Sequence, residues 1–189
     1  MLSIFGGLLF VGPHLLSSAF PGSRDGLKRS LGEGRFKGLY ALVTMAGLLL
    51  SIAGYVMGRW FSGAYDNLYE PWLSGRHLVM LLALLMFILL GAAGGKGYIK
   101  AWLGHPMSIG IALWAIGHLL VNGERPLVWL FGSLLVVALA DLLFSFGRGK
   151  RPSHVPQIKS DIRAVVIGIV VFLIFLFGFH PYILQMPVL

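Results

Sequence analysis

The sequence predicts an all-α fold, a polytopic membrane helix bundle of about six transmembrane helices with both termini on the periplasmic side. Hydrophobic residues make up 57% of the 189 residues and charged residues only 12%, a composition unlike that of soluble domains. The apolar residues fall into segments of membrane-spanning length, and the basic residues gather in every second loop. Because the connecting loops are short, we expect one domain over residues 1–189.

Six apolar segments follow one another along the chain, at residues 2–20, 38–60, 77–95, 106–121, 127–146 and 162–180. A helix needs about 20 apolar residues to cross a bilayer, and all but one of the segments come close to that length. The fourth is the shortest, so it either crosses without tilt or lies buried among its neighbours.

The first segment ends in Ser17, Ser18 and Ala19, which resemble the cleavage site of a secretory signal. No basic residue precedes this segment, however, and five follow it in the next loop, which is the reverse of the charge order in a signal. We therefore expect the segment to be retained as the first span.

The basic residues also predict the orientation. The first, third and fifth loops hold twelve of the fifteen Lys and Arg residues, and the second and fourth hold three. Because basic loops stay in the cytoplasm, we expect a multi-pass protein of the bacterial inner (cytoplasmic) membrane, with the lipid bilayer as its partner. The basic loops lack interleaved aromatic residues that could stack on bases, so we expect no nucleic-acid partner.

Two of the basic loops are long enough to have structure of their own. The loop at residues 21–38 predicts a brief interfacial turn, with Leu27 and Leu31 toward the membrane and the basic side chains toward water. The loop at residues 147–161 contains two prolines and predicts irregular structure, with Ser160 or Asp161 as the N-cap of the last helix.

Chemistry in this chain must come from histidines and carboxylates, because the chain has no cysteine and no HExxH, GxSxG or glycine-rich phosphate motif. His105 and His118 lie in the same short segment, thirteen residues apart. In a helix this spacing separates them by about 20 Å and about 220° of rotation, so they cannot share one small site. Each histidine must find its partners on other helices.

His105 directly precedes Pro106, a residue that favours the first position of a helix. The positive end of the helix dipole disfavours an imidazolium there and favours the neutral ring that coordinates metals. His14 lies about 9 Å above the predicted cytoplasmic end of the first span, at a similar depth. Two neutral histidines on facing helices are typical of a bis-imidazole haem site, so we predict His14 and His105 as cofactor-binding ligands of the haem iron.

Asp141 lies in the fifth segment, in the same predicted layer as His14 and His105. A carboxylate within the membrane is costly and normally faces a partner or a polar cavity. Asp141 could bond the distal nitrogen of a ligating histidine and orient its ring. The alternative is that His14 and Asp141 only form a hydrogen bond between helices.

On the predicted outer side, His118 precedes Asn122 by four residues, which would place both side chains on one helix face. They form either a secondary polar site or a network that ties helices together, and the second interpretation is favoured. No catalytic residue can be named from these patterns.

One long run of residues resembles a known family. The stretch IKAWLGHPMSIGIALWAIGHLLVNGE, residues 99–124, is similar to the signature of the NnrU family of multi-pass membrane proteins, in which an H-P-M opening and an H-L-L-x-N-G ending bracket the same helix. RDGLKRSLGEGRFKGLYALVTMAGLLLSIAGY at residues 24–55 and FHPYILQMPVL at residues 179–189 resemble the family's basic loop, second span and closing segment. The resemblance covers nearly the whole chain and is specific to a family, not to a reaction.

The resemblance implies a link to denitrification, through nitrite and nitric oxide reduction. It also implies haem b, because the related plant and cyanobacterial 15-cis-zeta-carotene isomerase shares the domain and uses histidine-ligated haem b to isomerise a carotenoid double bond in carotenoid biosynthesis. Carried over by position, the ligands of that enzyme fall on His14 and His105. The expected function is therefore haem-dependent, with a redox role, a partner in nitrogen-oxide metabolism or a hydrophobic polyene as substrate. A non-enzymatic transporter or accessory protein for nitrite and nitric oxide reduction is the alternative.

The chain departs from the family pattern at two places near the predicted ligands. Gly104 stands before the H-P pair where the family often has Arg, and Leu15 follows the first-span histidine where the family often has Ser. The absence of cysteine also means that the chain cannot copy the exchange of histidine for cysteine expected of the isomerase.

Overall fold

A computed structural model describes residues 1–62, 66–149 and 151–183 of the chain. Lys150 and the end of the closing segment, residues 184–189, lie outside these ranges. Within them every extended regular element is a helix, and the one isolated β-bridge joins Asn67 to Glu124. The predicted all-α class is confirmed.

The predicted apolar segments all form helices. They are α1 (Leu2–Ala19), α3 (Glu33–Ser62), α4 (Arg76–Ala93), α6 (Pro106–Val121), α7 (Arg125–Gly147) and α8 (Ile158–Ile174), which continues as the π-helix η2 (Phe175–Ile183). Among the described residues, five of these helical segments are long and apolar enough to cross a membrane, and the sixteen-residue α6 is shorter. The chain is therefore a membrane protein. Helix α6 is short, as the length of the fourth apolar segment predicts.

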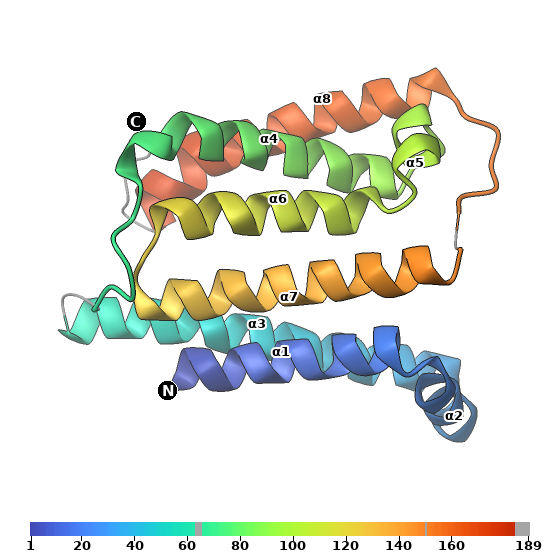
Figure 1. Ribbon diagram of the computed structural model, residues 1–189, viewed down its shortest axis with the longest axis horizontal. Helices are drawn as coiled ribbons and strands as arrows, with labels where there is room; N and C mark the ends of the chain where they lie inside the picture. Colours follow the sequence, from blue (N-terminus) through green and yellow to red (C-terminus); the bar gives the residue numbers. More distant parts are fainter. Residues whose placement is uncertain (63–65, 150, 184–189) are drawn as a thin grey trace. The chain divides into compact units, whose positions relative to one another are not determined.

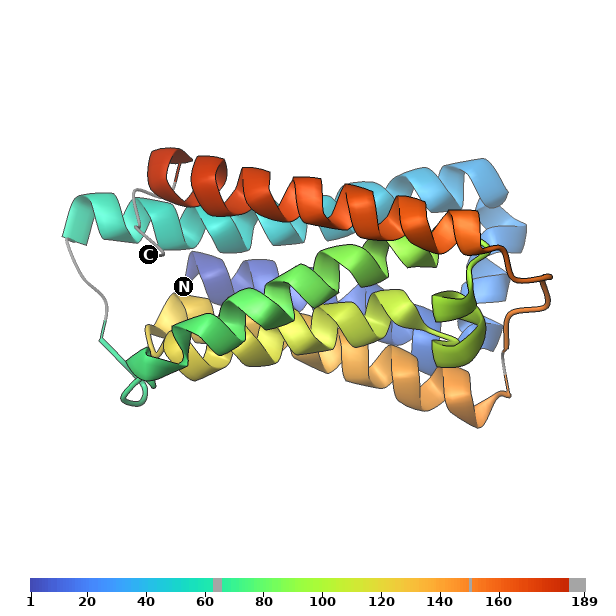
Figure 2. The ribbon, with the colours of Figure 1, turned by 90° about the horizontal axis from the view of Figure 1, so that it is seen from above.

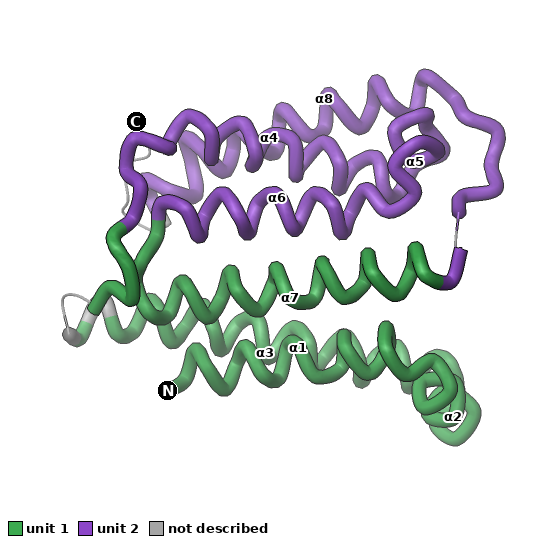
Figure 3. Tube along the Cα trace, viewed as in Figure 1, with its two compact units in different colours: residues 1–70, 122–147 green, residues 71–121, 148–189 purple. Residues whose placement is uncertain are grey.

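The described chain divides into two compact units (Figure 3). The first unit comprises residues 1–70 and 122–147, and the second comprises residues 71–121 and 148–189. The single domain over residues 1–189 stays a prediction.

In the first unit, α1, α3 and α7 pack side by side (Figure 1). Small residues allow α1 and α3 to approach closely, and a Cβ added at Gly47 would lie 2.6 Å from the Phe10 nitrogen. The Ser51 hydroxyl is fully buried in the same interface and donates to the Ser3 carbonyl at 3.2 Å. Close approach of this kind replaces the hydrophobic driving force that helices lack inside lipid.

Substituting Gly47 with alanine is expected to destabilise the first unit, because the added methyl meets backbone atoms of α1 that cannot move away singly. Overpacking of this type costs about 1–3 kcal/mol. Gly38 is a matched control on the same helix, since a Cβ there has nothing within 4 Å. Thermal unfolding in detergent should show a lower midpoint for Gly47→Ala and no loss for Gly38→Ala. Equal midpoints for the two variants would contradict the close packing.

In the second unit, α4 lies between α6 and α8 and packs against both (Figure 2). Glycines again form the closest contacts: Gly110 of α6 faces the Met86 backbone, and Gly168 of α8 faces the Ile88 backbone. Added Cβ atoms would lie 3.2 Å and 2.7 Å from those backbone atoms respectively. Helix packing therefore explains these glycines without a ligand.

The loop after α1 is more ordered than the sequence predicts. Instead of a brief turn it forms an eleven-residue helix, α2 (Pro21–Leu31), with Pro21 at the first helical position and Gly32 at a positive φ of 80° after its end. Proline and glycine favour these two positions because one has no N–H to satisfy and the other tolerates left-handed backbone. The prediction of a brief turn, which rested on Gly32 and Gly34, is wrong because Gly32 ends the helix only after eleven residues and Gly34 lies within α3.

The prediction of an N-cap at Ser160 or Asp161 is also wrong. Helix α8 begins at Ile158, and both residues lie inside its first turns. Their side chains instead accept hydrogen bonds from a neighbouring segment: the Lys96 N–H donates to Ser160 Oγ at 2.9 Å, and the Tyr98 N–H donates to Asp161 Oδ2 at 2.7 Å. The polar side chains that resemble a local cap thus join two elements far apart in sequence.

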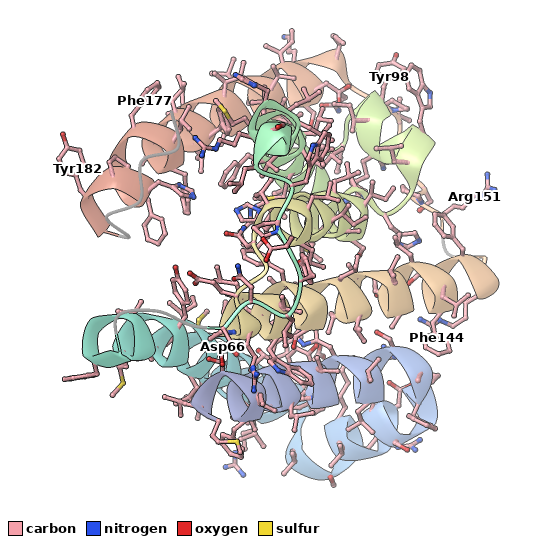
Figure 4. The ribbon with its side chains drawn as sticks, turned by 60° about the vertical axis from the view of Figure 1, so that its left-hand side comes forward. Asp66, Tyr98, Phe144, Arg151, Phe177 and Tyr182 are labelled. Atoms are coloured by element: carbon pink, nitrogen blue, oxygen red, sulfur yellow. The ribbon has the colours of Figure 1, made fainter. Side chains whose placement is uncertain are left out.

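The last helix changes character in η2, where the backbone widens into a π-helix that contains Pro181. Proline has no N–H for the regular helical bond, and π-helical turns are one way in which a helix accommodates such an interruption. Phe177 and Tyr182 point away from this stretch, with exposed fractions of 56% and 80% (Figure 4).

Candidate functional site

His14 lies on α1, and its ring is held in a defined orientation. Nδ1 lies 2.7 Å from the Phe10 carbonyl oxygen, one turn earlier in the same helix. Because a carbonyl can only accept, Nδ1 must carry the proton, and Nε2 of the neutral ring then carries the lone pair. A histidine that donates from one nitrogen to a carbonyl is prepared to coordinate a metal through the other.

Aromatic side chains flank the His14 ring within the first unit. The Phe10 ring centroid lies 4.4 Å from that of His14, and the Tyr40 ring of α3 meets His14 edge-on at 5.3 Å. These rings cover part of the half-buried His14 imidazole.

Asp141 of α7 belongs to the same unit as His14. The Ser145 hydroxyl donates to its Oδ1 at 3.5 Å. The His14 unit thus holds both the Tyr40 ring, which contacts His14, and the Asp141 carboxylate. The Phe10 carbonyl accepts the hydrogen bond from His14 Nδ1. The proposed contact between Asp141 and a ligating histidine therefore stays a prediction.

His105 belongs to the second unit and stands between α5 (Tyr98–Leu103) and α6. Gly104 adopts a positive φ of 75° and turns the chain, and Pro106 opens α6 as its sequence position predicts. The His105 N–H donates to the Leu103 carbonyl at 2.8 Å, and its own carbonyl accepts from the Ile109 N–H at 3.2 Å. The half-buried imidazole thus stands at the N-terminus of α6.

The segment before His105 is held by the start of α8. The Asp161 carboxylate, 7% exposed, accepts from the Tyr98 N–H at 2.7 Å and from the Ile99 N–H at 3.3 Å. A Cβ at Gly97 would clash with this carboxylate, so the glycine is needed for the close approach. His154 Nε2 also donates to the Gly97 carbonyl at 3.1 Å. Asp161 therefore caps α5 from another helix and helps to position His105.

The two predicted ligands lie in different units, His14 in the first and His105 in the second. Each unit presents one half-buried imidazole, and the pairing of the two around one iron stays a prediction. Among the described residues no group of three or more His, Cys, Asp or Glu side chains could hold a metal ion. A haem needs only its axial ligands from the protein, so two histidines could hold it without a cluster of three or more metal-binding side chains.

The predicted outer pair has its own partners. His118 Nδ1 donates to the Trp114 carbonyl at 3.0 Å, whereas Asn122 follows the last residue of α6 and its carbonyl accepts from the Tyr69 hydroxyl at 2.8 Å. Partial burial raises the pKa of Tyr69 above its usual 10, so this hydroxyl keeps its proton at neutral pH. A secondary polar site at His118 and Asn122 stays a prediction.

A model of the NnrU protein family matches residues 2–188. The chain belongs to the NnrU family. No curated protein and no solved structure is significantly similar to it. The family membership and the apolar helices together make the chain an NnrU-family membrane protein.

One departure from the expected family pattern has a physical explanation. Gly104 stands before the H-P pair, where Arg is expected. Its positive φ would strain the backbone of a residue with a side chain. Tyr40 is the residue near His14 that sequence reasoning missed. Its position three residues beyond Lys37, the last of the five basic residues in that loop, could have placed it at the depth of His14.

Proposed function

We propose that this NnrU-family membrane protein binds haem b, with His14 and His105 as the axial ligands, and serves redox or nitrogen-oxide metabolism. The observation that carries the proposal is the 2.7 Å contact of His14 Nδ1 with the Phe10 carbonyl, because it directs the lone pair of the ring to Nε2. The family match supports the link to nitrogen oxides only through the resemblance described above.

The residues present fit such a group. His14 is a half-buried neutral imidazole between aromatic rings, and His105 is a half-buried imidazole at the start of α6. Haem supplies an iron that exchanges electrons and whose potential depends on its axial ligands. The role of the chain would be to orient the His14 ring through the Phe10 carbonyl and to keep water away from it with aromatic side chains.

An absorption spectrum of the purified protein tests the proposal. The wild-type chain should show a Soret band with bis-histidine features, either as purified or after addition of haem. A protein that stays colourless after haem addition would reject haem binding and leave the transporter or accessory function. For the enzyme question, a cis-carotene should be supplied under reducing conditions, and a trans product in chromatography would assign the chain to the isomerases instead.

Substituting Asp141 with asparagine is expected to affect the haem indirectly, since the charge of Asp141 acts on Tyr40, whose ring contacts His14. Loss of a residue that supports a ligand typically weakens metal binding by about 10- to 100-fold, and the lower end is expected for an indirect effect. A haem titration should show weaker binding or a shifted Soret maximum. Asp25, an exposed acid on α2 that pairs with Arg24, provides the control Asp25→Asn. An unchanged spectrum and affinity in Asp141→Asn would remove Asp141 from the site.

A further inference from the structure

The first unit contains an apolar recess beneath the amphipathic helix α2. It has a volume of about 160 Å³ and is lined by residues of α1, α2 and α3, including Leu16, Leu27, Leu31 and Phe36. A cavity of about 150 Å³ with similar walls holds an apolar group the size of benzene. The recess can therefore take a segment of an acyl chain and is far too small for a porphyrin.

Two basic residues, Arg24 and Lys28, lie at this apolar recess. Arg24 is one of its lining residues, and its guanidinium uses Nε and Nη2 to bind Asp25 at 2.9 Å and 2.8 Å, which leaves three of its five donors. Lys28 Nζ lies 5.9 Å from the centre of the Phe36 ring, which also lines the recess. Helix α2 carries three basic residues and one acidic residue. The recess thus combines an apolar floor with a cationic rim.

Helix α2 has no buried residue of its own, although Leu27 and Leu31 are only 40% and 38% exposed. Leu27 and Leu31 line the recess with Arg24 beside them, and a short helix of leucines and basic residues is typical of the lipid headgroup region. Anionic headgroups are attracted to basic segments of this kind. A molecule with an apolar chain and a phosphate is therefore complementary to both parts of the recess.

We propose that the recess binds one anionic glycerophospholipid from the bilayer, with an acyl-chain segment on the Leu16, Leu27 and Phe36 side chains and the phosphate at Arg24 and Lys28. The recess shares Tyr40 with the surroundings of His14, but its test needs no haem and changes neither His14 nor His105. Unlike the lipids of the bulk bilayer, the bound lipid is retained at one molecule per chain. It is also selected by the charge of its headgroup.

The full chain should be reconstituted in vesicles of equimolar phosphatidylglycerol and phosphatidylcholine with identical acyl chains, then extracted in mild detergent for native mass spectrometry. One phosphatidylglycerol molecule per chain is expected to remain. Its preference over phosphatidylcholine should fall about fivefold in each of Arg24→Gln and Lys28→Gln, as one basic residue near a membrane surface contributes. The matched variants Arg163→Gln and Lys159→Gln remove exposed charges from α8 and should leave the preference unchanged.

A second pair of variants tests the apolar part. Leu27→Trp fills the recess and should reduce the retained lipid, whereas Leu42→Trp, at an exposed position of α3 outside the lining, should not. Soluble glycerol phosphate has the headgroup without the chain and should not displace the lipid. Equal retention of both lipids, equal loss in the α8 variants, displacement by glycerol phosphate, or release of the lipid by one equivalent of haem would each overturn the proposal.

Discussion

The His14→Ala variant is expected to lose the Soret band of the haem-loaded protein, or to bind haem more than about 100-fold more weakly, which exceeds the usual effect of losing a residue that only supports a ligand. The expectation follows from the fixed His14 ring, whose Nδ1 is committed to the Phe10 carbonyl and whose Nε2 is left to coordinate. Absorption spectroscopy and haem titration of the purified variant measure the loss.

His105→Ala should show a loss of the same size, since two axial ligands are proposed. His77 provides the control, because it is an exposed histidine at the start of α4, and His77→Ala should keep the wild-type spectrum. Circular dichroism of all three variants shows whether the helices remain. A folded His14→Ala protein with an unchanged spectrum would exclude His14, and a change in only one of the two predicted ligand variants would exclude the bis-histidine arrangement.

The Asp161→Ala variant is expected to destabilise helix α5. The substitution removes the acceptor of the Tyr98 and Ile99 amides, and hydrogen bonds to charged groups contribute about 1.5–3 kcal/mol. A helix of six residues is too short to be stable alone, so it depends on such contacts. Amide hydrogen exchange at Tyr98 and Ile99 should accelerate by about 10- to 100-fold.

Asp161→Asn keeps an acceptor at the same place and should give a smaller acceleration than Asp161→Ala. Asp25→Ala removes an exposed carboxylate that pairs with Arg24 and should leave exchange at α5 unchanged. If haem uses His105, Asp161→Ala should also weaken haem binding, because α5 leads directly into Gly104 and His105. Unchanged exchange at Tyr98 and Ile99 would contradict the capping role.

The spans could be predicted because each is a long apolar run and charged loops separate one run from the next. Helix α6 has the predicted bounds, Pro106–Val121. The elements that were missed are those whose stability comes from elsewhere in the chain. Helix α5 has only six residues and is capped by Asp161, sixty-three residues from Tyr98. No local pattern at residues 98–103 reveals that contact.

Depth along the helices predicted one layer for His14 and Asp141, and the structure brings both into the first unit, where Tyr40 contacts His14. Depth alone could not reveal the contact of Tyr40 with His14, because the usual role of an aromatic residue in a span is packing. It also could not reveal that Phe10 orients His14, since a backbone carbonyl has no sequence signal. The ring orientation comes from helix geometry, and the pairing with His105 stays a prediction for the haem experiments.

The bond between Tyr98 and Asp161 has a consequence for the order of events during synthesis. The ribosome completes α5 and His105 long before it reaches the residue that caps α5, sixty-three positions after Tyr98. Until α8 emerges, α5 lacks the carboxylate that accepts its first two amides, although Lys100 Nζ can already donate to the Ala93 carbonyl of α4. If haem uses His105, a chain truncated before residue 158 should therefore bind haem more weakly than the full chain.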